Sequence, residues 1–155
     1  LMRLPLVWRP AKSSGVAPAV VSRPVGLVDL APTFATIAGL EPAPWMQGQP
    51  LPADEADAEA RGFEKVLTEW DSELFGVAVH VRTITRPGWV CSAYRPGAVH
   101  DGTEGELYDL VHDPLQQRNL WDDPAHAATK ADLLADLWDS QPPARQPRLA
   151  VEAPV

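Results

Sequence analysis

The hydrophobic pattern of residues 1–62 predicts one strand and one helix. Residues 4–8 form a short continuous apolar run, which is typical of a strand buried on both faces of a parallel sheet. Residues 29–39 predict a helix. Its apolar side chains recur at helical spacing and predict one buried face: Leu30, Phe34, Ile37 and Ala38. Asp29 stands where an acidic residue is usually an N-cap, so we expect it to cap the helix and not to act as a catalytic acid.

After residue 62 the period of the pattern changes, and four β-prone runs follow one another. They are bounded by turn-forming residues and lie at 65–70, 77–84, 89–94 and 106–111. The second run alternates apolar and polar positions, and the Arg-Pro-Gly segment at 86–88 is a turn signal between the second and third runs. The runs therefore predict a small four-stranded antiparallel sheet.

Residues 124–140 predict the last helix. Asp123 and Pro124 open it, as an acidic N-cap followed by proline at the first helical position. The apolar stripe expected to cover the sheet consists of Ala127, Ala131, Leu134 and Trp138, widened by Leu133 and Leu137. The predicted fold is α/β, a fragment of α+β character. It comprises the last strand and helix of a large α/β domain, followed by the four-stranded antiparallel sheet packed against a C-terminal helix.

Acidic and proline-rich segments mark the predicted domain boundaries. We expect residues 1–52 to end the large α/β domain, 53–62 to be an acidic linker, 63–140 to form the sheet-plus-helix subdomain, and 141–155 to be a flexible proline-rich tail. A calcium site in the acidic stretch is disfavoured, because the stretch lacks the glycine turn and the ligand spacing of an EF-hand loop. A solvated surface segment is the favoured interpretation.

Charge and composition narrow the expected partners. The chain has 155 residues and a formal net charge of −8, which argues against a nucleic-acid partner and against an anionic membrane surface. No apolar run approaches the ~18 residues that a membrane-spanning helix needs. The chain has one cysteine, Cys91, so it forms no internal disulfide.

Two blocks of residues, in the same order as in a known family, carry a resemblance. The first is Pro-Val-Gly-Leu-Val-Asp-Leu-Ala-Pro-Thr at 24–33, followed by Ala-Gly-Leu at 38–40 and Met-Gln-Gly at 46–48. The second is Glu-Leu-Tyr-Asp-Leu at 106–110, followed by Asp-Pro at 113–114, Asn-Leu at 119–120 and Asp-Pro at 123–124. Together they resemble the C-terminal portion of the sulfatase family, within the alkaline-phosphatase-like superfamily.

The resemblance implies a parent enzyme that hydrolyses a small sulfate ester through a formylglycine nucleophile and a divalent metal, calcium in our interpretation. We expect the first residue to be a cut inside a larger domain, because a buried strand such as residues 4–8 needs neighbours on both sides. The expected partner is then the missing N-terminal catalytic portion. For the chain itself we expect no catalytic residue, no bound cofactor and no metal site.

One segment imitates the family's nucleophile motif. Cys91-Ser-Ala-Tyr-Arg95 has cysteine and arginine at the required spacing, but Ala93 replaces the required proline, and the segment lies in a predicted strand. We therefore interpret Cys91 as a small buried hydrophobic residue. No pair of histidines has metal-ligand spacing.

His80 belongs to the strongest candidate site. It shares a strand face with Arg82, and Glu69, Trp70 and Asp71 come from the preceding strand. Such a cluster can line the rim of a substrate pocket, and the resemblance favours this interpretation because the family sets specificity from this subdomain. The alternative is a solvated outer face of the sheet with ordinary ion pairs.

Two alternatives to a sulfatase fragment stay open. A phosphonate or phosphate ester hydrolase of the same superfamily would share the C-terminal motifs. A stand-alone, non-enzymatic binding module would have kept the small sheet without the rest.

Overall fold

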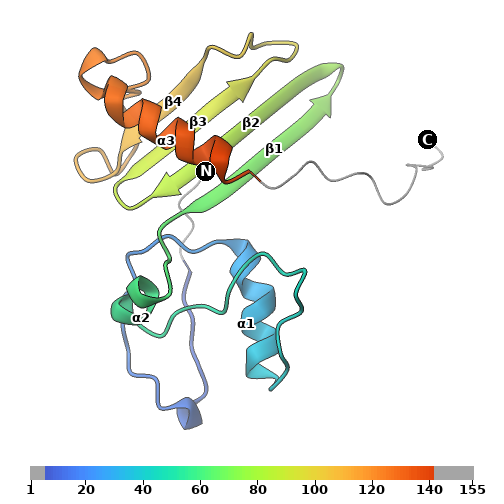
Figure 1. The fold of residues 1–155 in the computed structure, drawn as a ribbon, viewed down its shortest axis with the longest axis vertical. Helices are drawn as coiled ribbons and strands as arrows, with labels where there is room; N and C mark the ends of the chain where they lie inside the picture. The colour runs from blue at the N-terminus through green and yellow to red at the C-terminus, as the bar shows by residue number, and fades with distance from the viewer. Residues whose placement is uncertain (1–5, 142–155) are drawn as a thin grey trace, which may run out of the picture. The chain divides into compact units, whose positions relative to one another are not determined.

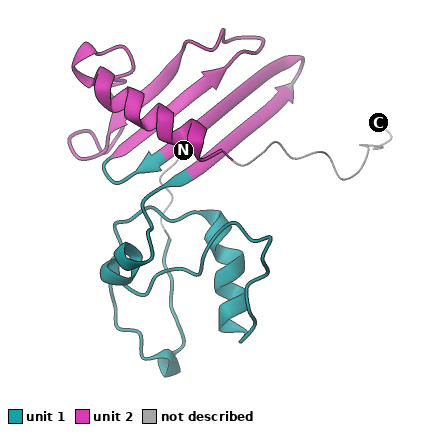
Figure 2. Cartoon of the chain, viewed as in Figure 1, with its two compact units in different colours: residues 1–66, 85–88 teal, residues 67–84, 89–155 magenta. Residues whose placement is uncertain are grey.

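The computed structural model describes residues 6–141 of the chain. These residues lie in two compact units (Figure 2). Of the described residues, the first unit comprises those up to 66 together with 85–88, and the second comprises 67–84 and those from 89 onward. None of the helices in the described part of the chain is long and apolar enough to cross a membrane.

The first unit is loop-rich and carries two α-helices, α1 (Leu30–Ile37) and α2 (Glu55–Ala60), with short 3-10 turns at Lys12–Ser14 and Leu27–Asp29 (Figure 1). Of the predicted strand at 4–8, residues 6–8 are described, and they adopt no strand; residues 4 and 5 lie outside the described residues. A strand requires a hydrogen-bonded neighbour, and the described residues supply none to this segment.

The apolar face that the spacing predicts on α1 is exposed, and no described residue covers it. The exposed fractions of Phe34 and Ile37 are 56% and 60%, and Trp8 lies against Phe34 with ring centroids 6.4 Å apart. The buried residues are Pro32 and Thr33. Thr33 is buried because its hydroxyl donates to the Asp29 carbonyl and accepts from the backbone of residue 51. Helix α1 is therefore anchored through Pro32 and Thr33 and not through Phe34 and Ile37.

Asp29 stabilises a loop and does not cap α1 as predicted. Its side chain makes no capping bond to α1. One carboxylate oxygen accepts from the Gly26 amide at 2.8 Å, and the other accepts from the Gln49 amide at 3.0 Å. The buried carboxylate thereby joins the 3-10 turn that precedes the helix to a segment twenty residues further on.

The acidic stretch at 53–62 contains a helix, α2, where the sequence predicted a solvated linker. Asp54 is its N-cap and accepts from the Asp57 amide, and Ala58 is buried. The Arg61 guanidinium bonds the Asp57 carboxylate at 3.0 Å. The cap and the alanine content favour a helix, and both outweighed the high charge.

The predicted four-stranded antiparallel sheet has the order β1 (Val66–Leu74), β2 (Val77–Arg86), β3 (Trp89–Arg95) and β4 (Gly105–Asp109), and all of it except residues 66 and 85–86 belongs to the second unit. Consecutive strands β1, β2 and β3 are joined by two-residue turns. Phe75 and Gly76 both have positive φ, at 53° and 76°, as a type I′ turn requires. Pro87 is followed by Gly88 at φ 79°, the pattern of a type II turn.

Helix α3 (Ala127–Asp139) lies across one face of the sheet (Figure 1), after a 3-10 turn at Pro124–His126. Asp123 caps this turn by accepting from the Ala125 amide, as the sequence predicts. The core between helix and sheet consists of Ile84, Cys91, Ala93, Leu107, Leu120, Trp121, Leu133 and Leu137.

Helix α3 is rotated relative to the predicted stripe. Leu133 and Leu137 form the centre of its buried face, whereas the exposed fraction of Trp138 is 44%. Lys130 contributes to the orientation, because its ammonium contacts the Trp121 carbonyl and lies over the Trp121 ring. A residue next to the centre of a helix face is turned by about 100°, which carries Trp138 to the edge of the contact.

The segment around Asn119 covers the outer edge of β4. The Asn119 side-chain carbonyl accepts from the Leu107 and Trp121 amides, both at 3.0 Å, and its amide donates to the Gly105 carbonyl. The Leu120 amide donates to the Leu107 carbonyl at 2.8 Å. The Asn-Leu pair at 119–120, which belongs to the second sequence block, thus fixes this segment along β4.

Candidate functional site

Three rows of side chains cross the sheet face on which α3 lies. Because side chains alternate between the two faces of a strand, residues 84, 82 and 80 of β2 share a face, as do 91, 93 and 95 of β3. The two-residue turns place residue 71 opposite 80, and 80 opposite 95. The Thr83–Ser92 hydrogen bond, at 2.8 Å on the other face, agrees with this register.

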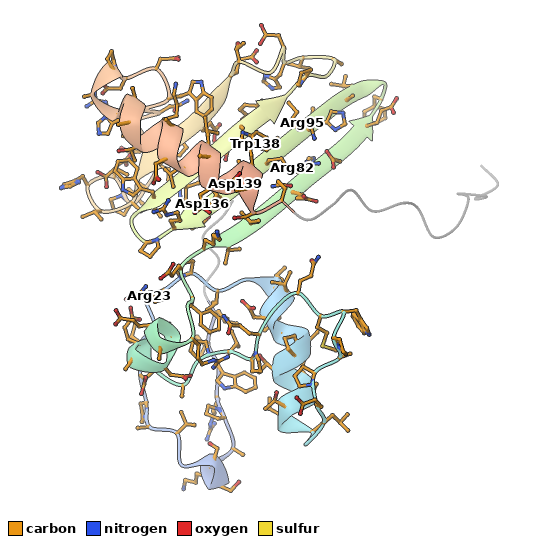
Figure 3. The ribbon with its side chains drawn as sticks, viewed as in Figure 1. Arg23, Arg82, Arg95, Asp136, Trp138 and Asp139 are labelled. Carbon is orange, nitrogen blue, oxygen red and sulfur yellow. The ribbon has the colours of Figure 1, made fainter. Side chains whose placement is uncertain are left out.

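The rows change from apolar to charged along the sheet. The apolar row contains Leu67, Ile84, Cys91 and Leu107 and lies in or against the core. The mixed row contains Glu69, Arg82 and Ala93. The charged row contains Asp71, His80 and Arg95. Figure 3 shows Arg82 and Arg95 near the C-terminal end of α3, beyond the part of the sheet that the helix covers.

Asp71 is the centre of the charged cluster. Its carboxylate accepts two hydrogen bonds from Arg82, at 2.9 Å from Nη1 and 2.7 Å from Nη2, and Oδ1 lies 2.8 Å from His80 Nδ1. Arg82 Nε lies 3.6 Å from the Glu69 carboxylate. The structure therefore brings together four of the five predicted rim residues.

The electrostatics of the cluster follow from these contacts. Hydrogen bonds from Arg82, and then from His80, lower the pKa of Asp71 to about 2. The bonds to Asp71 also raise the pKa of Arg82. Asp71 is thus a carboxylate at neutral pH, so the proton on His80 Nδ1 points toward it and the Nε2 atom has no role in that bond. This fixes the tautomer of a neutral His80.

Burial distinguishes this cluster from ordinary surface ion pairs. The exposed fraction of Arg82 is 8%, because its side chain lies between its neighbouring strands and next to the core residue Ala93. The alternative of a solvated outer face therefore does not hold for Arg82, which is buried. Glu69 and Asp71 are exposed.

Trp70 does not join the other predicted rim residues. It lies between Glu69 and Asp71 in β1, so its side chain emerges on the opposite face of the sheet. Its exposed fraction is 63%. The sequence reasoning grouped Trp70 with Glu69 and Asp71 because the three are adjacent, although adjacent residues of a strand lie on opposite faces.

Arg95 belongs to the site and was missed by the sequence reasoning. It is exposed and lines an open pocket of about 360 Å³ together with Asp71, His80 and Pro96. The sequence does contain the signal that would have found it. Counting outward in both directions from the two-residue Pro-Gly turn at 87–88 places residue 95 opposite residue 80.

Neither Cys91 nor Asp71 fits the nucleophile or the metal ligand that the resemblance implies. Cys91 is fully buried in β3, and burial raises the pKa of its thiol to about 11. The Asp71 carboxylate already binds the Arg82 guanidinium, which stands where a cation would bind. No group of three or more potential metal ligands occurs among the residues that the structure describes.

Known proteins resemble this chain in sequence and in structure. No family model matches the chain. The curated Delta 4,5-hexuronate-2-O-sulfatase of Bacteroides thetaiotaomicron is 29% identical over 113 residues, covering 72% of this chain. A solved structure of a 2-O GAG sulfatase matches with a TM-score of 0.60, 29% identity and 72% of this chain covered.

The chain is similar to sulfatases. A second solved structure, in complex with its substrate D-glucosamine-2-N,6-O-disulfate, is 20% identical with a TM-score of 0.55 over 73% of this chain, a likeness of fold alone. The sulfatase resemblance and the predicted α+β architecture are thus confirmed. The chain spans 22% of the curated sulfatase and 23% of each of the two solved structures.

Proposed function

We propose that this chain is the C-terminal part of a sulfuric ester hydrolase and that it carries one side of the substrate pocket. The observation that supports this most is the similarity to a 2-O-sulfatase, in sequence and fold, over 72% of the chain. The chain covers 22% of the curated relative and 23% of the solved structure, as expected for one part of a larger enzyme.

In this proposal the chain supplies substrate contacts and not the reaction centre. Glu69, Asp71, His80 and Arg82 form a charged cluster next to an open pocket. Cys91 and the cluster fit neither the formylglycine nucleophile nor the divalent metal that the resemblance implies. Both groups would belong to the portion of a sulfatase that this chain does not span, and that portion would be its partner.

The substrate class follows from the relatives. The curated relative is a Delta 4,5-hexuronate-2-O-sulfatase. We infer that the parent of this chain acts on a sulfate ester of a small acidic sugar. Domain boundaries at residues 52, 62 and 140 stay predictions within this proposal.

The test compares the 155-residue chain with the whole protein encoded by the reading frame that contains it. Both are assayed for sulfate release from a 2-O-sulfated unsaturated uronide disaccharide, with and without calcium, and for release of phosphate or phosphonate from aryl esters. We expect the whole protein to release sulfate and the 155-residue chain to release none. Faster release of phosphate or phosphonate would favour the alternative hydrolase, and binding without any hydrolysis would favour a binding module.

A further inference from the structure

We propose that Arg95 and His80 form a binding site for an oxyanion carried by a sugar, either a carboxylate or a sulfate ester. The proposal rests on the proposed function, since it names the part of the substrate that this pocket recognises.

Arg95 has an unused positive charge. It lies at the C-terminal end of β3 and makes no hydrogen bond or ion pair with any residue between 6 and 141 for which the structure describes the side chain. Its side chain lines the pocket. A guanidinium presents donors in a planar fork that matches the geometry of carboxylate and sulfate oxygens.

The carboxylate that lines the same pocket as Arg95 is already hydrogen-bonded to other side chains. Asp71 lines the same pocket, but its two oxygens accept three hydrogen bonds, two from Arg82 and one from His80. Two of these bonds come from the buried Arg82 guanidinium, so the charge of the Asp71 carboxylate is already paired. Arg95 is therefore left to an anion from outside.

His80 supplies a second, oriented group. Its Nδ1 atom bonds Asp71, so the ring is held in one orientation and Nε2 remains for a ligand. When Nε2 carries a proton it donates to an anion, and when it does not it accepts from a sugar hydroxyl. His80 and Arg95 lie opposite each other on neighbouring strands, within reach of one ligand.

The loop after β3 builds a fixed wall next to these residues. The Ala98 amide donates to the Ala78 carbonyl at 3.1 Å, and the Gly97 amide donates to the His100 carbonyl at 2.9 Å. A Cβ at Gly97 would lie 2.7 Å from the Ala78 carbonyl oxygen and 3.5 Å from His80 Cδ2. Glycine thus permits the loop backbone to approach β2 and to border the His80 ring.

Size agrees with a small ligand. The pocket volume of about 360 Å³ lies at the lower end of the range for small-molecule sites, roughly 300–1,000 Å³. The pocket therefore has room for one charged sugar residue.

The test titrates the 155-residue chain with three sugars that differ in charge: methyl glucuronide, glucose 6-sulfate and methyl glucoside. Binding is followed by the NMR resonances of the His80 ring and of Arg95 Nε–Hε. We expect one or both charged sugars to shift these resonances and the neutral sugar to leave them unchanged, and the stronger of the two identifies the oxyanion. Arg95→Gln should weaken binding by about tenfold or more, because a charge-assisted hydrogen bond is lost.

The matched control is Arg118→Gln, which removes an exposed arginine whose partner, Asp123, lies outside the pocket. It should bind as the unmodified chain does. Equal affinity for the neutral sugar, or unchanged affinity in Arg95→Gln, overturns the site. If the anions bind but the whole protein releases no sulfate from any ester, the proposed function fails and the site stands. If sulfate is released but neither anion shifts these resonances, the site fails alone.

Discussion

Removing Asp71 should destabilise the second unit by leaving the buried Arg82 guanidinium with a weaker partner. In Asp71→Ala, Arg82 loses two hydrogen bonds at 2.7 and 2.9 Å and keeps the Glu69 carboxylate 3.6 Å from its Nε. Charge-assisted bonds contribute about 1.5–3 kcal/mol, and exposed pairs about 0–1 kcal/mol. Since the Asp71 side chain is 49% exposed, we expect a loss of about 1–2 kcal/mol.

The double variant Asp71→Ala with Arg82→Met separates pairing from burial. Methionine keeps the apolar contacts of the arginine stem and removes the charge that Asp71→Ala leaves poorly paired. The double variant should therefore be more stable than the sum of the two single changes predicts, by about 1 kcal/mol. The assay is urea unfolding followed by circular dichroism at pH 7. Additive losses would show that Asp71 and Arg82 act independently and would refute the reasoning.

Acidification gives a second measurement on the same variants. The pKa of Asp71 is lowered from 3.8 in its ordinary state to about 2 in the folded chain. A carboxyl group with a lowered pKa stabilises the fold above the unfolded value, and that contribution is lost as the pH falls through the folded value. The stability difference between the unmodified chain and Asp71→Ala should therefore be present at pH 7 and shrink between about pH 4 and pH 2. A pH-independent difference contradicts the assignment.

Three further predictions concern the core. Leu137→Ala should lower the free energy of unfolding by about 2–5 kcal/mol, and Trp138→Ala by less than about 2 kcal/mol, since Leu137 is fully buried and Trp138 is not. Urea unfolding midpoints of the two variants compare the losses, and a larger loss for Trp138→Ala would show that α3 docks through Trp138. Cys91 should not react with a disulfide reagent at pH 8 until urea unfolds the chain, because burial raises the pKa of its thiol to about 11. The reaction is followed by absorbance, and rapid labelling of the folded chain would contradict the burial of Cys91. Gly105→Ala should cost at least about 2 kcal/mol by thermal unfolding, because a Cβ there meets the Ser92 carbonyl and the Trp121 ring; an unchanged melting temperature would show that these contacts are not tight.

Local patterns were sufficient to predict the sheet. The two hairpin connections contain residues with strong turn preferences, Gly76, Pro87 and Gly88, so the strand ends at these connections are determined close by in the sequence. The last helix was also predictable from Asp123 and Pro124. Its rotation was not, because a stripe of six apolar residues allows more than one buried centre. The contact between Lys130 and Trp121 helps to determine the rotation of α3, and the spacing of apolar residues does not reveal this contact.

The first unit was harder to predict, since its elements are stabilised by bonds between distant residues. The amide of Gln49 reaches Asp29, and Thr33 accepts from the backbone of residue 51. Neither contact has a periodic signature. The pattern in α1 correctly identified an apolar face, but spacing alone cannot say whether anything covers that face.

The candidate site was predictable in part for a geometric reason. Glu69, Asp71, His80 and Arg82 lie on two strands joined by a tight turn, so their proximity follows from alternation and charge. Trp70 was included by adjacency, although alternation places it on the other face. Arg95 requires the register of a third strand, which follows only after the turn at 87–88 has been assigned as a two-residue connection.

The Asn119 side chain has a consequence for how this sheet can associate with other chains. Sheets extend by adding strands to unpaired edges, and such edges are where proteins aggregate. On β4 the Gly105 carbonyl and both backbone groups of Leu107 are bonded by Asn119 and Leu120, so they are not available to a foreign strand. At the opposite edge, β1 carries Glu69 and Asp71, and an approaching strand must place its own side chains against these carboxylates. The β4 edge is thus paired by the side-chain amide of Asn119, which bonds as a backbone amide would. The β1 edge carries the negative charges of Glu69 and Asp71.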